Sequence, residues 1–246
     1  MKAEWIINNE VLSNIKKIID DNSNRPFVKD RYKKNIEKVG IDLSRNTIWK
    51  VLVGCEITTQ QKSGPGSPVD RFLKSNNVVL TYDNCKLLDT NTIASELRKN
   101  SLRNNKRIAK FLTEIINNLE NGEWVILLEN LNKLIKKHNI EDEVIVAKYL
   151  HSGRFKGLGL KQSRNFLQWL GLTEYEIPID SRELKVLKKC KCNFVPGASA
   201  LSDETTYLFL EKGIQRVCEE LNIKPCILDA CFFASFDKED FSEEIY

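Results

Sequence analysis

Apolar residues recur at every third or fourth position along most of the chain, a spacing that predicts α-helices rather than strands. Residues 4–20 carry one such apolar face, and the segment 26–39 predicts a second helix. A third helix is predicted over 47–57, with Ser44 as its N-cap. Because this third segment is apolar nearly all round, we expect it to lie at the centre of the fold.

The same periodicity returns after a less regular middle section. The stretch 58–68 is polar and rich in Gly and Pro, which is typical of a loop, and Ser67-Pro68 opens a short helix through Leu73. Residues 76–90 fit either a short strand or an irregular connection. Further helices are predicted at 93–102, 108–119, 125–135, 141–150, 182–189, 203–217 (capped by Asp203) and 225–232. The sequence therefore predicts an all-α fold of roughly ten helices.

Composition narrows the class of protein only modestly. A chain of 246 residues makes one large domain or two small ones, and 41% hydrophobic residues can form a real core. The net charge of +4 permits an anionic partner without requiring one. No apolar run reaches the length of a membrane-spanning helix, and no secretory signal precedes the first helix. We therefore expect a cytoplasmic protein with no membrane partner.

The seven cysteines do not predict a metal site. Their odd number and their positions in apolar stretches favour reduced, buried thiols. Cys190 and Cys192 are too closely spaced for an ordinary zinc knuckle, and no second pair or His cluster completes one. We expect neither a metal nor an organic cofactor.

The chemistry of the chain is concentrated in residues 154–182. Gly157-Leu158-Gly159 predicts a tight hairpin between two helices, because glycine tolerates positive φ and allows close backbone approach. Leu158 can pack inside this hairpin. The helix that follows presents free N–H groups at its N-terminus, and with the helix dipole these form a site suited to one phosphate.

Lys161 and Asp180 form the candidate catalytic pair. Lys161 falls in the first turn of the helix after the hairpin, an unusual place for a cation because it opposes the positive end of the dipole. A neutral lysine amine is a nucleophile that forms Schiff bases. Asp180 follows Pro178 and precedes the predicted helix 182–189, so it is a natural N-cap. One helix and a return loop would bring Asp180 beside Lys161.

This segment resembles the helix-hairpin-helix/Gly-Pro-Asp superfamily of DNA glycosylases. The residues that carry the resemblance are Gly157-Leu-Gly-Leu-Lys161, Gly171, and Pro178-Ile-Asp180, with the spacing of that family. The resemblance implies a single glycosylase unit over 1–246 with two helical lobes. One lobe is expected over 40–153, and the other over 1–39 plus 154–246 with the hairpin at 154–171.

The resemblance also implies a role for each site residue. Lys161 would be the nucleophile and Asp180 the essential carboxylate of a base-excision enzyme with strand-nicking (lyase) activity. The expected partner is double-stranded DNA with a damaged base, bound by a monomer associated with the nucleoid. DNA contacts are expected from Gly157, Leu158, Gly159, Arg182, Gln60 and Gln61, the last two as a loop that fills the gap left by the everted base. Asn165, one turn after Lys161, would touch that base.

Two departures from the family refine this prediction. Cys218, Cys226 and Cys231 lack the spacing and the fourth cysteine of the family's iron–sulfur loop, so we expect no cluster. This favours the cluster-free branches, which include the 8-oxoguanine glycosylases. Arg182 stands where relatives often carry His; Arg also binds phosphate. The leading substrate is therefore 8-oxoguanine.

Several alternatives stay open at this stage. Lys161 alone would be read as an exposed helix lysine, and Asp180 as a structural cap. Gln60 and Gln61 also fit a solvated turn, and Asn165 a surface or capping residue. The chain as a whole also fits a glycosylase for alkylated or otherwise modified bases that leaves the strand intact. A second hypothesis is a DNA-binding protein without chemistry, because the hairpin occurs in many such proteins.

Overall fold

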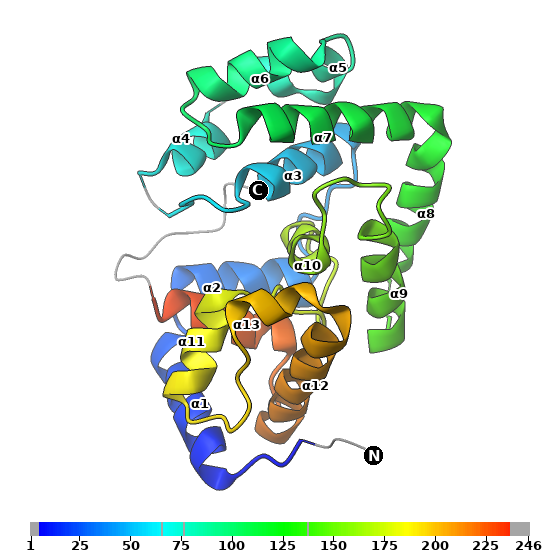
Figure 1. Cartoon of the computed structure of the whole chain (residues 1–246). Helices are drawn as coiled ribbons and strands as arrows, with labels where there is room; N and C mark the ends of the chain where they lie inside the picture. Colours follow the sequence, from blue (N-terminus) through cyan, green and yellow to red (C-terminus); the bar gives the residue numbers. More distant parts are fainter. Residues whose placement is uncertain (1–4, 65, 76, 137, 237–246) are drawn as a thin grey trace. The chain divides into compact units, whose positions relative to one another are not determined.

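The computed structural model describes residues 5–64, 66–75, 77–136 and 138–236, and every regular element in these ranges is helical. The all-α prediction is confirmed. The α-helices are α1 Asn9–Asn22, α2 Pro26–Arg31, α3 Arg45–Ile57, α4 Pro68–Lys74, α5 Tyr82–Cys85, α6 Thr90–Lys99, α7 Asn105–Asn118, α8 Trp124–Lys133, α9 Ile140–Leu150, α10 Leu160–Trp169, α11 Ser181–Lys189, α12 Glu204–Leu221 and α13 Pro225–Ala234 (Figure 1). Single helical turns of other types are η1 Tyr32–Ile36, η2 Val78–Leu80, η3 Leu119–Glu123 and η4 Ala198–Ser202.

Two compact units make up the described chain. One contains the residues up to Val39 and those from Thr173 onward; the other is Gly40–Leu172. Segment 154–171 was predicted to belong with the terminal segments. In the structure this segment belongs with 40–172, because α10 packs against α3 and α9.

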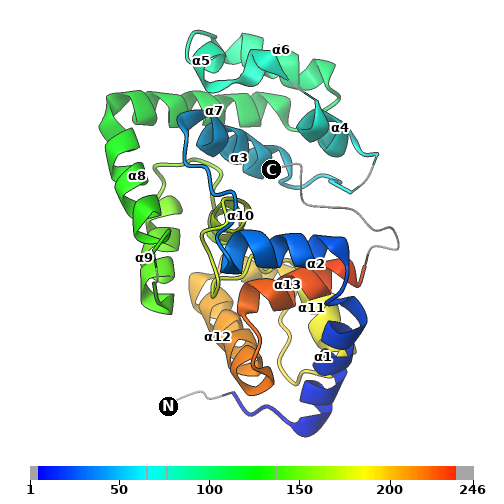
Figure 2. The ribbon, with the colours of Figure 1, turned by 180° about the vertical axis from the view of Figure 1, so that it is seen from behind.

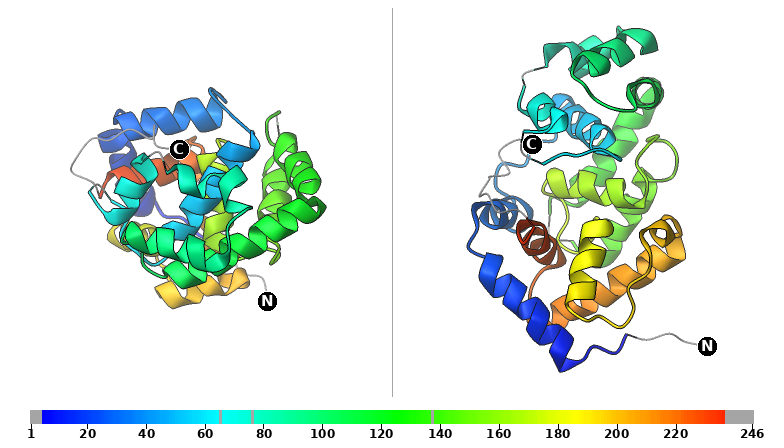
Figure 3. Two further views of the ribbon diagram at one scale, coloured as in Figure 1. Left: turned by 90° about the horizontal axis from the view of Figure 1, so that it is seen from above. Right: turned by 60° about the vertical axis from the view of Figure 1, so that its left-hand side comes forward.

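The unit Gly40–Leu172 is built around α3. Every residue of α3 from Ile48 to Ile57 except Lys50 is buried, which confirms its predicted central place. Around it, α6 lies beside α7, and α8 pairs with α9 (Figures 1 and 3). Ser44 caps α3 by accepting a hydrogen bond from Thr47 N, as predicted.

The terminal unit is built around α13. Nine of the ten residues of α13 are buried, and α1, α2, α11 and α12 all pack against it (Figure 2). Apart from Asp229, its sequence is apolar all round, as expected for a helix covered on every side.

Several predicted boundaries were wrong for local reasons. The first helix begins at Asn9 and not at residue 4, because Asn8 caps it; residues 1–4 lie outside the described chain. Trp5 is not helical, and its indole donates to Phe209 O at 2.8 Å. The segment 26–39 ends its α-helix at Arg31 and adds the π-helical turn η1. Within 76–90 the described residues form η2 and α5, so the strand alternative is excluded there.

Candidate active site

The hairpin before α10 uses its two glycines differently. Helix α9 ends at Leu150, where the predicted helix 141–150 ends. In the turn that follows, Leu158 N donates to Phe155 O at 3.0 Å, and the Leu158 side chain is buried. Gly157 has φ +88°, which L-residues rarely adopt, whereas Gly159 has φ −78°. Only Gly157 therefore needs glycine for its conformation, and Gly159 leaves open space where a ligand backbone can approach.

Helix α10 begins without a side-chain cap and carries Lys161 in its first turn. Gly159 is the N-cap residue, and no side chain bonds to the first-turn N–H groups as a cap. Ser163 N donates to Gly159 O at 2.9 Å, which closes the first turn. An uncapped helix N-terminus attracts anions through its N–H groups and dipole. The half-buried Lys161 thus stands at a position with the polarity for a phosphate-bearing ligand.

Glu56 is a buried carboxyl that the sequence analysis missed. It lies in the last turn of α3, is 2% exposed, and packs on Gly157, where an added Cβ would meet its oxygens at 2.1 and 2.2 Å. Among the described residues, Glu56 Oε1 has no hydrogen-bond partner. Burial, opposed in part by Arg107, raises the pKa of Glu56 to about 8. Near neutral pH this carboxyl is mostly uncharged.

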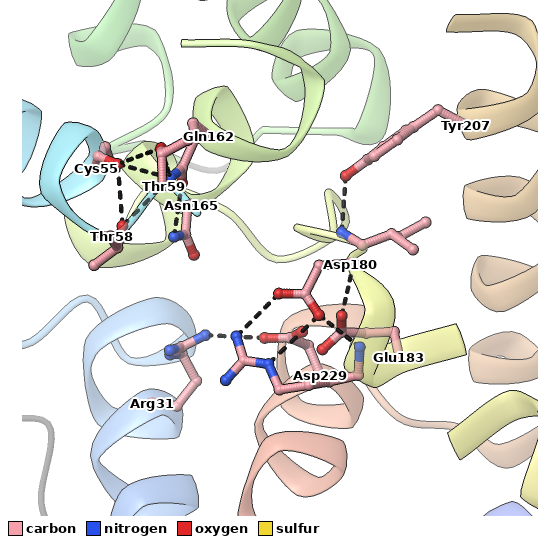
Figure 4. Close-up of polar contacts among 12 residues, drawn as sticks. Arg31, Cys55, Thr58, Thr59, Gln162, Asn165, Asp180, Glu183, Tyr207 and Asp229 are labelled. Atoms are coloured by element: carbon pink, nitrogen blue, oxygen red, sulfur yellow. Dashed lines mark hydrogen bonds and ion pairs between the residues drawn. The ribbon is translucent and has the colours of Figure 1, made fainter. Parts of the chain in front are cut away.

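A polar network joins the start of α10 to the end of α3 (Figure 4). Gln162 Nε2 donates to Cys55 O at 2.6 Å and to Thr59 Oγ1 at 2.8 Å. Asn165 Nδ2 in turn donates to Gln162 Oε1 at 3.0 Å. Gln162 and Asn165 are both buried. The predicted base contact Asn165 is thereby held in a fixed orientation on the same helix as Lys161.

The two predicted wedge residues differ in their surroundings. Gln60 is exposed in a left-handed backbone conformation, with φ +57°, and its Oε1 accepts a 3.4 Å bond from Arg107. Gln61 is half-buried, donates to Ile57 O, and accepts from Arg103 N at 2.9 Å. The nitrogen and the oxygen of the Gln61 amide thus both form hydrogen bonds that stabilise the loop. The wedge role stays a prediction, and Gln60 is the more accessible of the two.

Asp180 caps α11 in the terminal unit, as predicted. Its Oδ1 accepts from Arg182 N at 2.7 Å, and its own backbone N donates to Glu183 Oε2 at 2.7 Å. The Asp180 side chain also accepts from the backbone N of Glu183, so Asp180 and Glu183 form a capping box. The preceding residues are also fixed, since Ile179 N donates to Tyr207 Oη at 2.8 Å. The Asp180 carboxylate therefore has a defined direction before any ligand binds.

Charged groups surround Asp180 within the same unit (Figure 4). Arg182 Nη2 lies 3.1 Å from Asp180 Oδ2, and its guanidinium stacks 4.6 Å above the ring of Phe233. Burial acts to lower the pKa of Arg182, but Asp180, Glu183 and Asp229 together outweigh this effect and raise it.

Two more carboxyls complete this cluster. Burial, together with Asp180 and Asp229, raises the pKa of Glu183 well above its usual range. Asp229 pairs with Arg31 at 3.5 Å. Arg182, predicted to bind DNA, is thus an ion-pair partner of the candidate catalytic carboxylate in this structure.

The candidate residues fall into two groups. Gly157, Leu158, Gly159, Lys161 and Asn165 share the hairpin and α10 in the unit 40–172, while Asp180 and Arg182 belong to the terminal unit. The meeting of Lys161 with Asp180 stays a prediction. Glu183 had a sequence signal, the Asp-x-x-Glu pattern of a capping box. Glu56 and Gln162 had none, because their partners are distant in sequence.

No His, Cys, Asp or Glu residues of the described chain gather in a group of three that could hold a metal ion. The seven cysteines form no disulfide, and all except the half-buried Cys192 are buried. None of the described helices has the length and apolar character needed to cross a membrane.

In the described residues, every regular element is helical, and a glycine hairpin leads into the lysine-bearing helix α10. No family model and no curated protein sequence matches the chain. Solved structures do match over nearly the whole length.

The match with the 8-oxoguanine DNA glycosylase of Methanocaldococcus jannaschii spans 95% of this chain and 98% of that protein, with a TM-score of 0.68 and 19% sequence identity. The structure of the Methanocaldococcus jannaschii 8-oxoguanine glycosylase/lyase with a 15mer DNA containing 8-oxoguanine covers 94% and 99%, with a TM-score of 0.66 and 18% identity. The 8-oxoguanine DNA glycosylase of Thermotoga maritima covers 94% and 98%, with a TM-score of 0.66 and 18% identity. The predicted resemblance is confirmed at the level of the fold.

Proposed function

We propose that this chain is a DNA glycosylase with lyase activity that removes an oxidised base, 8-oxoguanine first among them, from double-stranded DNA. The observation that carries the proposal is Lys161 in the uncapped first turn of α10, directly after the glycine hairpin, in a chain with the fold of 8-oxoguanine glycosylases. The neighbour solved with DNA carries 8-oxoguanine, which supports the same class of substrate.

The chemistry begins with a nucleotide turned out of the duplex, which costs least at a lesion. Lys161 Nζ attacks the sugar carbon that bears the base, and the bond from this carbon to the base nitrogen breaks, so that the base leaves with the electron pair. The amine loses a proton, and the ring-opened sugar becomes an imine with Lys161. Loss of a proton from the next sugar carbon then expels the 3′ phosphate oxygen, which nicks the strand.

Asp180 is proposed to stabilise the positive charge that grows on the sugar, or to accept the proton from Lys161. Its capping bonds fix the carboxylate, so it needs no reorientation during the reaction. Arg182 holds Asp180 at 3.1 Å in the free protein. A DNA phosphate would compete with Asp180 for this guanidinium, since both are anions that bind Arg.

The hairpin is proposed to bind the DNA backbone. A phosphate at the N-terminus of α10 would face open space at Gly159, where no atom lies within 4 Å of an added Cβ. Gln60, exposed and left-handed, is proposed as the residue that enters the gap left by the everted base.

Borohydride trapping tests the nucleophile. The wild-type protein should be captured covalently on 8-oxoguanine duplex DNA, because borohydride reduces the imine to a stable amine. Lys161→Ala should abolish capture, whereas Lys156→Ala, an exposed lysine just before the hairpin, should not. Undiminished trapping by Lys161→Ala would refute the assignment.

Base release and strand nicking must be scored separately on a panel of duplexes that each carry one modified base. Asp180→Asn should slow base release by roughly 100-fold or more while DNA affinity changes little. Base release without nicking or trapping would identify a glycosylase that uses water as its nucleophile. Salt-dependent binding without any abasic product would identify a non-enzymatic DNA-binding protein.

A further inference from the structure

Helix α10 carries a second polar group on the side of Lys161. Asn165 follows Lys161 by four positions, so the two residues share one helix face with their Cβ atoms about 5–6 Å apart. Asn165 is 8% exposed, although a short amide side chain is usually solvated. Its position is therefore set by the packing of α10 and not by free movement in solvent.

Hydrogen bonds from the end of α3 fix the polarity of this side chain. The Cys55 carbonyl lies in the last turn of α3, where carbonyls lack partners within the helix. It accepts from Gln162 Nε2 at 2.6 Å and from Thr59 Oγ1 at 3.1 Å. Since the donor end of Gln162 is used here, its Oε1 must face Asn165.

Within the described chain, this arrangement leaves one hydrogen-bond acceptor of Asn165 unoccupied, the atom Oδ1. Asn165 Nδ2 donates to Gln162 Oε1 at 3.0 Å, so Asn165 Oδ1 points away from Gln162 (Figure 4). No described residue donates to this oxygen. The reverse orientation of either amide would set two carbonyl oxygens, or two N–H groups, against each other. The position of Asn165 Oδ1, a hydrogen-bond acceptor, is thus fixed.

We propose that Asn165 Oδ1 accepts a hydrogen bond from an N–H group of the everted base, and that Gln162 is the positioning residue that fixes this polarity. The inference rests on the proposed function, because Lys161 marks where the sugar carbon lies. One helical turn from Lys161, the base atoms within reach are those close to the bond between base and sugar.

The chemistry of the base then indicates the substrate class. Guanine presents N7 as a hydrogen-bond acceptor, so N7 and the Asn165 oxygen would repel each other. Oxidation at C8 places a carbonyl there and a hydrogen on N7, so the same edge becomes a donor. The locked amide therefore selects purines oxidised at C8 over undamaged guanine.

The test compares two activities of the intact protein on two DNAs. One duplex carries 8-oxoguanine, and the other a preformed abasic site, which has no base for Asn165 to contact. Asn165→Leu should slow release of 8-oxoguanine by roughly 10- to 100-fold, while nicking at the abasic site stays within about twofold of wild type. Asn165→Ala, which adds no bulk, replaces it where the leucine variant does not fold.

Gln162→Leu should lower the ratio of base release to abasic-site nicking by several-fold, because Asn165 can then rotate. A merely structural role would lower both activities equally and leave this ratio unchanged. Gln215→Leu is the matched control, since it also removes a glutamine Nε2 bond to a carbonyl (Tyr175 O, 3.1 Å) and should not change the ratio.

Three other outcomes distinguish failure of the inference, of the substrate class and of the proposed function. Wild-type rates of 8-oxoguanine release by both Asn165 variants would overturn the inference and leave the proposed function intact. A wild-type protein that nicks abasic DNA but does not release 8-oxoguanine would overturn the substrate class. Wild-type protein inactive on both DNAs would refute the proposed function, and the inference with it.

Discussion

Replacement of Glu56 by glutamine should remove a large pH dependence from the free energy of unfolding. Glu56 is 2% exposed, packs on Gly157, and its Oε1 lacks a hydrogen-bond partner among the described residues. Burial, opposed in part by Arg107, raises its pKa from 4.5 to about 8. The folded protein therefore binds this proton more tightly than the unfolded chain does.

The sign and size of the effect follow from this difference. Below pH 4.5 the carboxyl is protonated in both states, so it does not penalise folding. As the pH rises to about 8, the unfolded chain is ionised while the folded protein keeps the proton, and the free energy of unfolding falls. The slope approaches about 1.4 kcal/mol per pH unit. Glu56 should therefore cost the wild-type protein roughly 2–3 kcal/mol between pH 5 and pH 7.

Urea unfolding of wild type and Glu56→Gln from pH 5 to pH 8 measures this cost. Glutamine has its own fixed penalty for a buried amide, but that penalty does not change with pH. All other titrating groups are shared, so they cancel when the two curves are subtracted. Glu141→Gln, at an exposed position, controls for the loss of one charge. A constant difference between wild type and Glu56→Gln at every pH would show that the reasoning is wrong.

Three further outcomes follow from the structure. Gly157→Ala should lower the free energy of unfolding by about 1–3 kcal/mol, because φ is +88° and the new Cβ meets the Glu56 carboxyl. Gly159→Ala should lower the free energy of unfolding by less than about 1 kcal/mol, because its added Cβ meets no atom within 4 Å. The same Gly159→Ala variant should nevertheless bind DNA more weakly in a filter-binding assay. Ser67→Ala should cost about 1 kcal/mol in thermal unfolding, since Ser67 Oγ caps α4 through Asp70 N at 3.0 Å; an unchanged midpoint would contradict this. A thiol reagent should label only Cys192 in the native protein, because the other six cysteines are buried. Labelling should be slow at neutral pH, because burial and then Cys190 raise the pKa of Cys192 to about 11. Rapid labelling of several thiols would count against the buried positions of the other cysteines.

Local rules in the sequence predicted the parts of the fold that depend on neighbours in the chain. Ser44, Ser67, Asp180 and Asp203 all cap helices in the structure through their own side chains, as their positions before apolar runs indicate. The apolar periodicity likewise predicted helices α6 to α9 to within a few residues. Each of these features is decided within about one helical turn.

The errors lie where distant residues decide the structure. Trp5 was assigned to a helix by its apolar spacing, but it packs on Gly213, where an added Cβ would meet its ring at 2.2 Å. Nothing near Trp5 in the sequence indicates this contact. Glu56 is similar: a charged residue in a mostly apolar helix is expected in solvent, yet Glu56 is buried against the Gly157 backbone. A charged residue buried by chain far away in sequence has no local signature.

For Asp180, the helix-capping rule predicts one functional property, the direction of the carboxylate, but not the charges that surround it. Its place after Pro178 indicated a cap, and the cap explains why its carboxylate has a fixed direction. The sequence did not indicate that Arg182, two residues on, would also pair with it while stacked on Phe233. That stack depends on α13, more than forty residues away in the chain. The cap therefore fixes where the carboxylate points, while tertiary packing sets the charge that faces it, and a reaction that needs Asp180 as a free anion must first draw Arg182 away.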